Sequence, residues 1–268
     1  MTEKSHPHLF LTNDDGAHSL ALEALIKELH PHYRLSVVIP DTPRSGISKA
    51  VTFDKPLRFE KGNTIAGQPI IETTGTPADA VAWCRTYCKD CQLVVSGPNL
   101  GLNVSVHSIL TSGTVGAAIE AATWSIPAIS FSIETPSENW FFPNNTDVNV
   151  EEVARRAHRL IDHVISHGLP QGVDFLNVNF PTRLDASTPT RVACPTRIRF
   201  INRLKRRTDP QGNQYYWIAG KEKRIVPDKS DVYITTRDLH IVISPISIKL
   251  ADEKLLEATR DYLKPIFL

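Results

Sequence analysis

Apolar and polar positions alternate in blocks along the first part of the chain. The apolar run 9–12 leads into the polar tetrapeptide 13–16, after which apolar residues recur at helical spacing over 20–29. A second apolar run, 35–40, again ends in a polar segment rich in turn-forming residues, 41–46. The order strand, loop, helix, strand is typical of a parallel βαβ unit.

The same blocks continue to about residue 190. Thr76 is suited to cap a helix, Pro77 to occupy its first position and Asp79 to favour its positive end, so we expect a helix to begin there. Right-handed crossovers between such units predict an α/β protein with a Rossmann-like, mostly parallel sheet flanked by helices. Further strands are expected over 92–96, 128–133 and 175–180, and further helices from 112 and over 150–165.

Two stretches have a different pattern. Short alternating runs between 50 and 75 predict small β-hairpins inserted beside the main sheet. The chain beyond residue 191 is β-rich and ends in an amphipathic helix over about 253–262. We therefore expect a single domain over 1–268, with the core at about 1–190 and a C-terminal extension at about 191–268. Strands of the extension are predicted at 191–194, 214–218, 232–235 and 239–244.

Charge and composition exclude several classes of protein. The 30 basic and 29 acidic residues give a net charge of +1, so no overall field favours a nucleic acid polymer or an anionic membrane. The basic run 203–207 is more typical of a solvated hairpin or a subunit contact than of a substrate-binding patch. No apolar run approaches the roughly 20 residues of a membrane span, and the first residues do not resemble a signal peptide. We expect a cytoplasmic protein.

Three cysteines have a spacing that suggests a cofactor. Cys84, Cys88 and Cys91 form a C-x3-C-x2-C pattern, which in a loop would suit an iron–sulfur cluster. Here Cys84 and Cys88 fall on one face of the helix expected from Pro77, where small buried thiols are common. Packing is the favoured interpretation, and a zinc site or a disulfide stays open.

Oxygen-bearing side chains follow three of the predicted strands. Asp14 and Asp15 follow the first, Ser45 follows the second, and Asn99 with Asn103 follows the third. Ligands of open parallel sheets bind beyond the carboxyl ends of the strands, so we expect these side chains to lie together. Carboxylate, hydroxyl and amide oxygens suit Mg²⁺, Mn²⁺ or Ca²⁺.

An anion site is expected next to these oxygens. Ser112, Gly113 and Thr114 stand at the start of a predicted helix, where free backbone N–H groups and the helix dipole favour phosphate. A metal ion beside a helix N-terminus is a reasonable clamp for a phosphoryl group.

An ordered set of motifs runs along nearly the whole chain. The motifs are Asn13–Gly16, Pro40–Asp41 with Arg44–Gly46, Gly75–Asp79, Val95–Asn99 with Gly101 and Asn103, Ser112–Val115, Leu176–Pro181, Asp209–Gly212, Tyr216–Trp217, Ser230–Val232 and Ile243–Ile246. This set resembles that of the SurE nucleotidases. The resemblance implies a Rossmann-like core, a β-rich extension that forms homodimers or homotetramers, and hydrolysis of nucleoside 5′-monophosphates, in some members also 3′.

The resemblance also implies a set of site residues. The metal ligands are Asp14, Asp15, Ser45 and Asn99, which would hold one Mg²⁺ or Mn²⁺ per subunit. Asp14 and Asp15 are the expected catalytic residues. The expected phosphate-binding residues are Ser112, Gly113, Thr114 and Asn103.

Some alternatives can be weighed from the residues. A phosphatase with an aspartate nucleophile needs a second aspartate two positions later, and Gly16 holds that place after Asp14, so we reject a covalent route. His107 is a candidate proton donor to the leaving group, although a single loop histidine is more often a bystander. A non-catalytic metal- or nucleotide-binding protein and a broad-specificity acid phosphatase or exopolyphosphatase remain alternatives.

Overall fold

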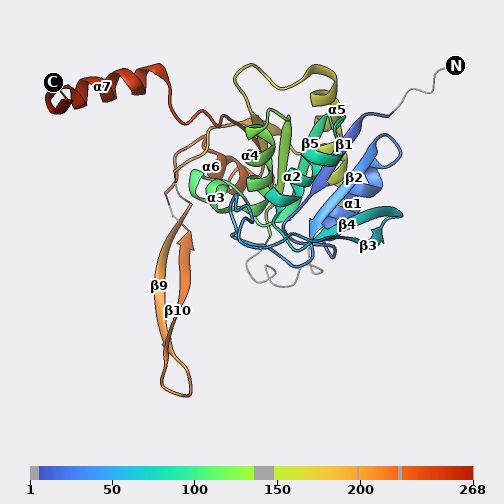
Figure 1. Ribbon diagram of the computed structural model, residues 1–268, viewed down its shortest axis with the longest axis horizontal. Coiled ribbons are helices and arrows are strands. Elements are labelled where there is room, and N and C mark those ends of the chain that lie inside the picture. Colours follow the sequence, from blue (N-terminus) through green and yellow to red (C-terminus); the bar gives the residue numbers. More distant parts are fainter. Residues whose placement is uncertain (1–5, 136–147, 198, 223–224, 268) are drawn as a thin grey trace.

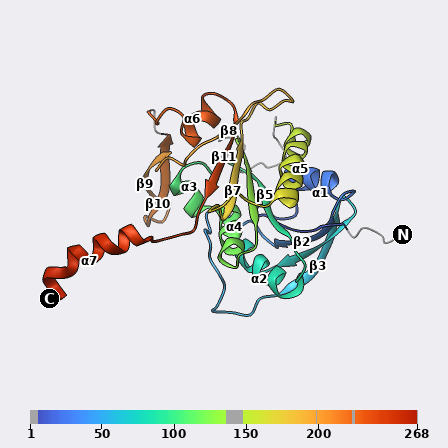
Figure 2. The same ribbon diagram turned by 90° about the horizontal axis from the view of Figure 1, so that it is seen from above.

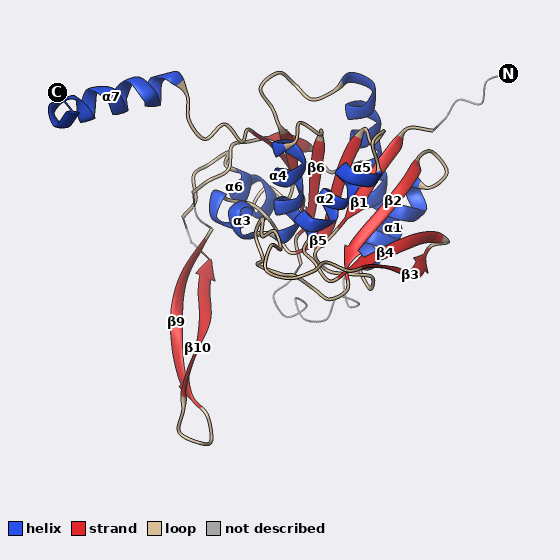
Figure 3. Ribbon diagram, viewed as in Figure 1, coloured by secondary structure: helices blue, strands red, loops and turns tan. Residues whose placement is uncertain are grey.

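The structure is a computed structural model that describes residues 6–135, 148–197, 199–222 and 225–267. A sheet forms its centre (Figures 1 and 3). It has nine strands in the order β3-β4-β2-β1-β5-β6-β7-β11-β8. Its strands are β1 (His8–Thr12), β2 (Arg34–Pro40), β3 (Phe59–Ile65), β4 (Gln68–Thr73), β5 (Leu93–Leu100), β6 (Ala128–Ile133), β7 (Phe175–Phe180), β8 (Thr190–Val192) and β11 (Ile241–Ile246).

Most neighbouring strands run parallel. The pairs from β4 through β2, β1, β5 and β6 to β7 are all parallel. Antiparallel pairing is confined to the two sides of the sheet, where β3 pairs with β4 and β11 pairs with β7. The predicted mostly parallel, helix-flanked sheet is confirmed.

Helices cover both faces of this sheet (Figure 2). Successive side chains of a strand point to opposite faces, so Leu9 and Leu11 of β1 pack in one core and Phe10 in the other. The first core includes α1 (Leu20–Leu29) and α5 (Val150–His167), and the second includes α2 (Pro77–Tyr87) and α4 (Gly113–Thr123). Crossover helices on both faces bury the central strands completely, which fixes the positions of their carboxyl ends.

The C-terminal extension leaves the body of the molecule in two places. Strands β9 (Phe200–Thr208) and β10 (Gln214–Glu222) form a separate antiparallel hairpin that projects from the sheet, and α7 (Glu253–Phe267) projects in another direction (Figures 1 and 2). Between them, α6 (Asp231–Thr236) and β11 return to the body.

One predicted strand of the extension is wrong. Residues 232–235 belong to the helix α6. Ser230 caps this helix by accepting a hydrogen bond from the Tyr233 N–H at 3.3 Å, and the Thr235 and Thr236 hydroxyls bond to carbonyls four residues earlier. These local polar bonds outweigh the β preference of branched and aromatic side chains.

The segment between 50 and 75 also differs from the prediction. It contributes one hairpin, β3–β4, and β4 pairs in parallel with β2, so the hairpin extends the main sheet instead of lying beside it. Residues 51–53 belong to no strand.

Two boundaries near the third predicted strand need correction. Strand β5 continues past a bulge between Ser96 and Asn99 and ends at Leu100, where the sequence had suggested a loop from Gly97. The polar segment after it contains a short helix, α3 (Val106–Thr111), capped by the Ser105 side chain.

The packing interpretation of the cysteines is confirmed. Cys84 and Cys88 are buried in the core beneath α2, and Cys84, Cys88 and Cys91 are all free thiols. Among the described residues, no group of three His, Cys, Asp or Glu side chains is arranged to hold a metal ion. Within the same ranges, no helix combines the length and apolar character that a membrane crossing requires.

Candidate active site

The carboxyl ends of β1, β2 and β5 meet the start of α4 at one cavity of about 340 Å³. This is the crevice where ligands bind in open parallel sheets. Three of the predicted oxygen-bearing side chains, those of Asp14, Ser45 and Asn99, line it together with Asn103, and Asp15 is not among the lining residues. Its lining is Asp14, Ser45, Gly46, Asn99, Leu100, Gly101, Leu102, Asn103, Ser108, Thr111, Ser112, Arg199 and Phe200.

Asp14 lines the cavity and lies against the first turn of α4. Its carboxylate accepts a hydrogen bond from the Thr114 hydroxyl and is further stabilised by the backbone N–H groups of Thr114 and Gly113. A Cβ on Gly113 would stand 2.9 Å from Asp14 Oδ2, so only glycine lets the helix approach this closely. Burial raises the pKa of Asp14, and the hydrogen bonds from α4 oppose that rise.

Asp15 faces β5 from the same loop. Its Oδ2 accepts a hydrogen bond from the Leu100 N–H at 3.2 Å. Burial, and then the charge of Asp14, raise the pKa of Asp15 to about 7. Asn13 holds the loop by bonding both the N–H and the carbonyl of Gly16, whose φ of +82° favours glycine.

The charges of the two adjacent carboxylates are not balanced by any ion pair within the part of the chain that the structure describes. None of the ion pairs between described residues involves Asp14 or Asp15. Two like charges at a partly dehydrated site are costly unless a bound cation neutralises them. The donors around them are oxygens of Ser45 and Asn99, so the site fits a hard divalent ion.

One hydrogen bond holds the loop of Ser45, and another orients the side chain of Asn99. The Arg44 N–H donates to the Asp14 carbonyl at 2.8 Å, which ties the loop after β2 to the loop after β1. The Asn99 amide N–H donates to the Gly101 carbonyl at 2.6 Å, so its side-chain oxygen remains available for a ligand.

The predicted phosphate residues divide into two groups. Ser112 and Asn103 line the cavity, and their side chains also support the fold. The Ser112 hydroxyl oxygen accepts from the Val115 N–H at 3.1 Å, and the Asn103 amide donates to Ser132 at 2.8 Å. Gly113 and Thr114 contact Asp14 and are not among the residues that line the cavity. His107 is exposed on α3 and does not line it either.

Sequence reasoning missed Arg199 and Phe200, which form part of the cavity wall together with Leu102. The Arg199 guanidinium lies 4.8 Å from the centre of the Phe200 ring, and its Nη2 is 4.0 Å from Glu134 Oε1. Both residues stand at the base of the β9–β10 hairpin, far along the chain from the strand ends. No local motif marked them, because only the path of the C-terminal extension brings them to the site.

Asp231 connects the extension to this wall. Its carboxylate accepts the backbone N–H groups of Ser105, Thr196 and Val232 at 2.5, 2.8 and 2.8 Å. The first of these fixes the start of α3, whose residues Ser108 and Thr111 line the cavity.

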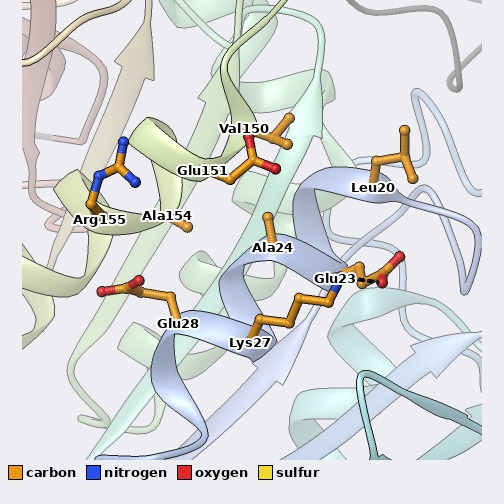
Figure 4. Close-up of a pocket in the computed structure, with 9 residues that line it drawn as sticks. All are labelled: Leu20, Glu23, Ala24, Lys27, Glu28, Val150, Glu151, Ala154 and Arg155. Atoms are coloured by element: carbon orange, nitrogen blue, oxygen red, sulfur yellow. Dashed lines mark ion pairs between the residues drawn. The ribbon is translucent and has the colours of Figure 1, made fainter.

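A second cavity of about 310 Å³ lies between α1 and α5 (Figure 4). Charged side chains dominate its rim, and Lys27 pairs with Glu23 at 2.7 Å in the i, i+4 spacing of a solvated helix face. It contains none of the residues at the strand ends, so it is a weaker candidate for chemistry.

Comparison with known proteins agrees with this geometry. Residues 9–203 match the family model described as Survival protein SurE. Two relatives named 5′-nucleotidase SurE, from Methanosarcina barkeri and Hyperthermus butylicus, are each 34% identical over 90% of this chain and over 92% and 85% of their own length. The crystal structure of the SurE protein from Aquifex aeolicus superposes with a TM-score of 0.79 at 28% identity, covering 96% of this chain and 100% of that one. The chain therefore belongs to the SurE family.

Proposed function

We propose that the chain is a divalent-metal-dependent phosphomonoesterase that converts nucleoside 5′-monophosphates to nucleoside and phosphate. The observation that carries this proposal is the buried carboxylate of Asp14, which lines one cavity with Ser45 and Asn99 and stands next to the half-buried Asp15. Among the described residues, neither carboxylate forms an ion pair with a cationic side chain. The relatives named 5′-nucleotidase SurE support the same reaction.

The metal would be held by Asp14, Asp15, Ser45 and Asn99. One Mg²⁺ or Mn²⁺ bound there would supply positive charge that neutralises the phosphoryl oxygens during transfer. The choice between the two ions, like a cytoplasmic location, stays a prediction.

The protein's own groups would orient the substrate and the catalytic carboxylates. Thr114 and Gly113 hold Asp14 in place through the first turn of α4, so its carboxylate does not have to reorganise during the reaction. Ser112 and Asn103 face the cavity, where they are positioned to contact phosphate oxygens. A carboxylate of the pair would accept a proton from the attacking water.

The opposite wall is suited to a nucleoside. Phe200 offers an aromatic face and Leu102 an apolar surface, while Arg199 adds a cation beside the ring. A base can stack on such a wall while the phosphate reaches the oxygen-rich end of the cavity.

We also propose that the extension forms a homo-oligomer. Apolar side chains on the β9–β10 hairpin and on α7 are exposed in the single chain, an arrangement that marks protein contact surfaces. They are Leu204, Tyr215, Tyr216, Trp217, Ile218, Leu255, Leu256, Tyr262 and Ile266.

The function is tested by a phosphate-release panel on the full chain. AMP, GMP, the corresponding 3′-monophosphates, polyphosphate and p-nitrophenyl phosphate are each incubated with Mg²⁺, Mn²⁺ or EDTA. We expect release from 5′-monophosphates with either ion and none in EDTA. Nucleotide binding without turnover under every condition would instead support a non-catalytic binding protein.

A further inference from the structure

A short segment between β5 and α3 carries Asn103 to the wall of the candidate active site. Leu102 and Val104, on either side of Asn103, are buried in a core cluster with Val232 and Val242 of the C-terminal extension. Residues 101–105 belong to no helix or strand, so no backbone ladder fixes their position. The place of Asn103 at the cavity therefore depends on the polar contacts that this residue makes.

Three buried side chains of β6 and β7 hold Asn103 by its polar groups. The Asn103 N–H donates to Asn179 Oδ1 at 2.8 Å, and the Asn103 carbonyl accepts from Asn177 Nδ2 at 2.9 Å. The side-chain Nδ2 of Asn103 donates to Ser132 Oγ at 2.8 Å. We call Asn177, Asn179 and Ser132 the Asn103 bracket. It fixes the backbone of Asn103 on both sides and orients its side-chain amide.

The register of the sheet brings the side chains of the Asn103 bracket together. Strands β6 and β7 are parallel, and Ser132 is the register partner of Asn179. Asn177 stands two residues before Asn179, so both project from one face of β7, while Val178 between them packs in the core on the other face. Ser130, the register partner of Asn177, donates to Asn177 Oδ1 at 2.9 Å and thereby orients the amide of Asn177.

Asn179 uses only the oxygen of its side-chain amide. The side chain is fully buried, and its Nδ2 has no hydrogen-bond partner among the described residues. A buried amide N–H group without an acceptor destabilises a fold, and the adjacent residues Val178 and Phe180 are apolar. Packing alone therefore does not explain an asparagine at this position. The contact of its Oδ1 with the Asn103 N–H is the interaction that an apolar residue could not supply.

Asn103 lines the cavity, whereas Asn177 and Asn179 do not. The Nδ2 of Asn103 carries two hydrogens, and Ser132 is its acceptor among the described residues, so the second hydrogen is available to a phosphate oxygen. Any effect of Asn177 or Asn179 on a bound phosphate therefore passes through Asn103.

We propose that Asn177 and Asn179 are positioning residues, which hold Asn103 at the cavity as a hydrogen-bond donor to the phosphoryl group. This inference rests on the function proposed above and assigns two residues outside the cavity to it. A donor that is fixed before the ligand arrives binds an anion without reorganising, whereas a loose segment must be ordered during binding. Loss of either asparagine should therefore weaken phosphate binding, provided that Asn103 is present to make the contact.

Hydrogen exchange tests the positioning itself, without a ligand. In the full chain carrying Asn179→Ala, the Asn103 amide loses its acceptor, and we expect it to exchange at least about tenfold faster. Ser244→Ala is the matched control, because Ser244 is buried opposite Asn177 in β11 and its Oγ has no partner among the described residues. The control should keep the original exchange rate. An unchanged rate at Asn103 in folded Asn179→Ala would overturn the proposal.

The effect on the ligand is measured as the Kd of inorganic phosphate for the Mn²⁺-loaded full chain, by calorimetry, which needs no turnover. Asn103→Ala and Asn179→Ala should each raise this Kd by about tenfold. The double variant should stay within about twofold of Asn103→Ala, because Asn179 acts through Asn103. Asn177→Ala, which removes the donor to the Asn103 carbonyl, is a second variant and should raise the Kd in the same direction.

The Kd of Mn²⁺ separates positioning from a general loss of structure. Among the described residues, the side chains of the Asn103 bracket form no hydrogen bond with a proposed metal ligand, so the Mn²⁺ Kd should be unchanged in Asn179→Ala and Asn177→Ala. Additive losses of phosphate affinity in the double variant, or a parallel loss of Mn²⁺ affinity, would overturn the inference and leave the proposed reaction standing. Phosphate binding with the expected pattern but no turnover of any monophosphate would support the positioning role and overturn the proposed reaction.

Discussion

At the residue scale, we expect Asp15 to couple proton binding to metal binding. Its pKa rises to about 7 in the metal-free protein because of burial and the Asp14 charge. A raised carboxyl pKa stabilises the metal-free fold fully below the ordinary value of 3.8, and this contribution is lost as the pH rises through about 7. A divalent ion needs the deprotonated carboxylate, so the proton and the metal compete.

We therefore expect the metal affinity to decrease as the pH is lowered. Below about pH 7, the apparent affinity for Mn²⁺ should decrease by up to about tenfold per pH unit, and binding should release protons. Isothermal titration calorimetry in buffers of different ionisation enthalpy measures both the apparent Mn²⁺ affinity and the number of protons released. Asp15→Asn should bind Mn²⁺ more weakly and with a flatter pH dependence. Equal affinity on both sides of pH 7 in the unaltered protein would be inconsistent with this coupling.

We expect Phe200 to distinguish nucleotides from small phosphate esters. Phe200→Ala removes the stacking surface, and since base–aromatic stacking contributes about 1–3 kcal/mol, we expect KM for AMP to rise by about tenfold or more. The KM for p-nitrophenyl phosphate should change less, because that substrate carries no nucleobase. Phe200→Tyr is the matched control and should retain the AMP value. An equal rise in KM for both substrates would mean that Phe200 supports the fold of the cavity wall and does not select the base.

At the scale of elements, Asp231 joins α6 to the active-site wall. It accepts three backbone N–H groups from separate segments, and burial raises its pKa against their effect. Asp231→Ala leaves those donors without a partner, so we expect a loss of about 3 kcal/mol in the free energy of unfolding. Urea unfolding measures it, with the exposed Asp228→Ala as control. Equal midpoints for the two variants would contradict the structural role of Asp231.

The elements also show what the sequence could and could not predict. Hydrophobic spacing identified the central strands, α1 and α5, because their burial follows directly from periodicity. The capping residues Thr76, Pro77 and Asp79 identified the start of α2. Hydrophobic spacing gave the wrong element at residues 232–235. There the Ser230 hydroxyl accepts from a backbone N–H of the first turn, and the threonine hydroxyls donate to carbonyls four residues earlier, which favours a helix. Hydrophobic spacing did not predict α3, because only Ile109 of that helix is buried and a single buried residue sets no helical periodicity.

Distance along the chain from a strand end decides which residues of the candidate site could be predicted. Asp14, Ser45 and Asn99 could be predicted because each directly follows or ends a strand of the parallel sheet. Arg199 and Phe200 could not, since their approach depends on the tertiary path of the extension. The contact of Thr114 with Asp14 was also hidden, because it depends on the close approach of α4 that Gly113 permits.

At the scale of the whole molecule, the two projecting arms predict assembly. Leu255 and Leu256 are exposed on α7 in the single chain, and an amphipathic helix gains stability when its apolar face is covered. We expect the double variant Leu255→Glu, Leu256→Glu to shift the protein toward smaller species in light scattering coupled to size-exclusion chromatography. Lys254→Glu, also exposed, is the control. An unchanged mass for the double variant would remove α7 from the interface.

We propose that the carboxylate pair after β1 forms a metal-dependent phosphatase centre. The most direct measurement is phosphate release from AMP with Mn²⁺ by the unaltered chain, Asp14→Asn and Asp54→Asn, the last being an exposed aspartate outside the cavity. We predict that Asp14→Asn lowers kcat by at least about 100-fold while Asp54→Asn stays within about twofold of the unaltered chain. Equal turnover by Asp14→Asn, with EDTA sensitivity retained, would contradict the account.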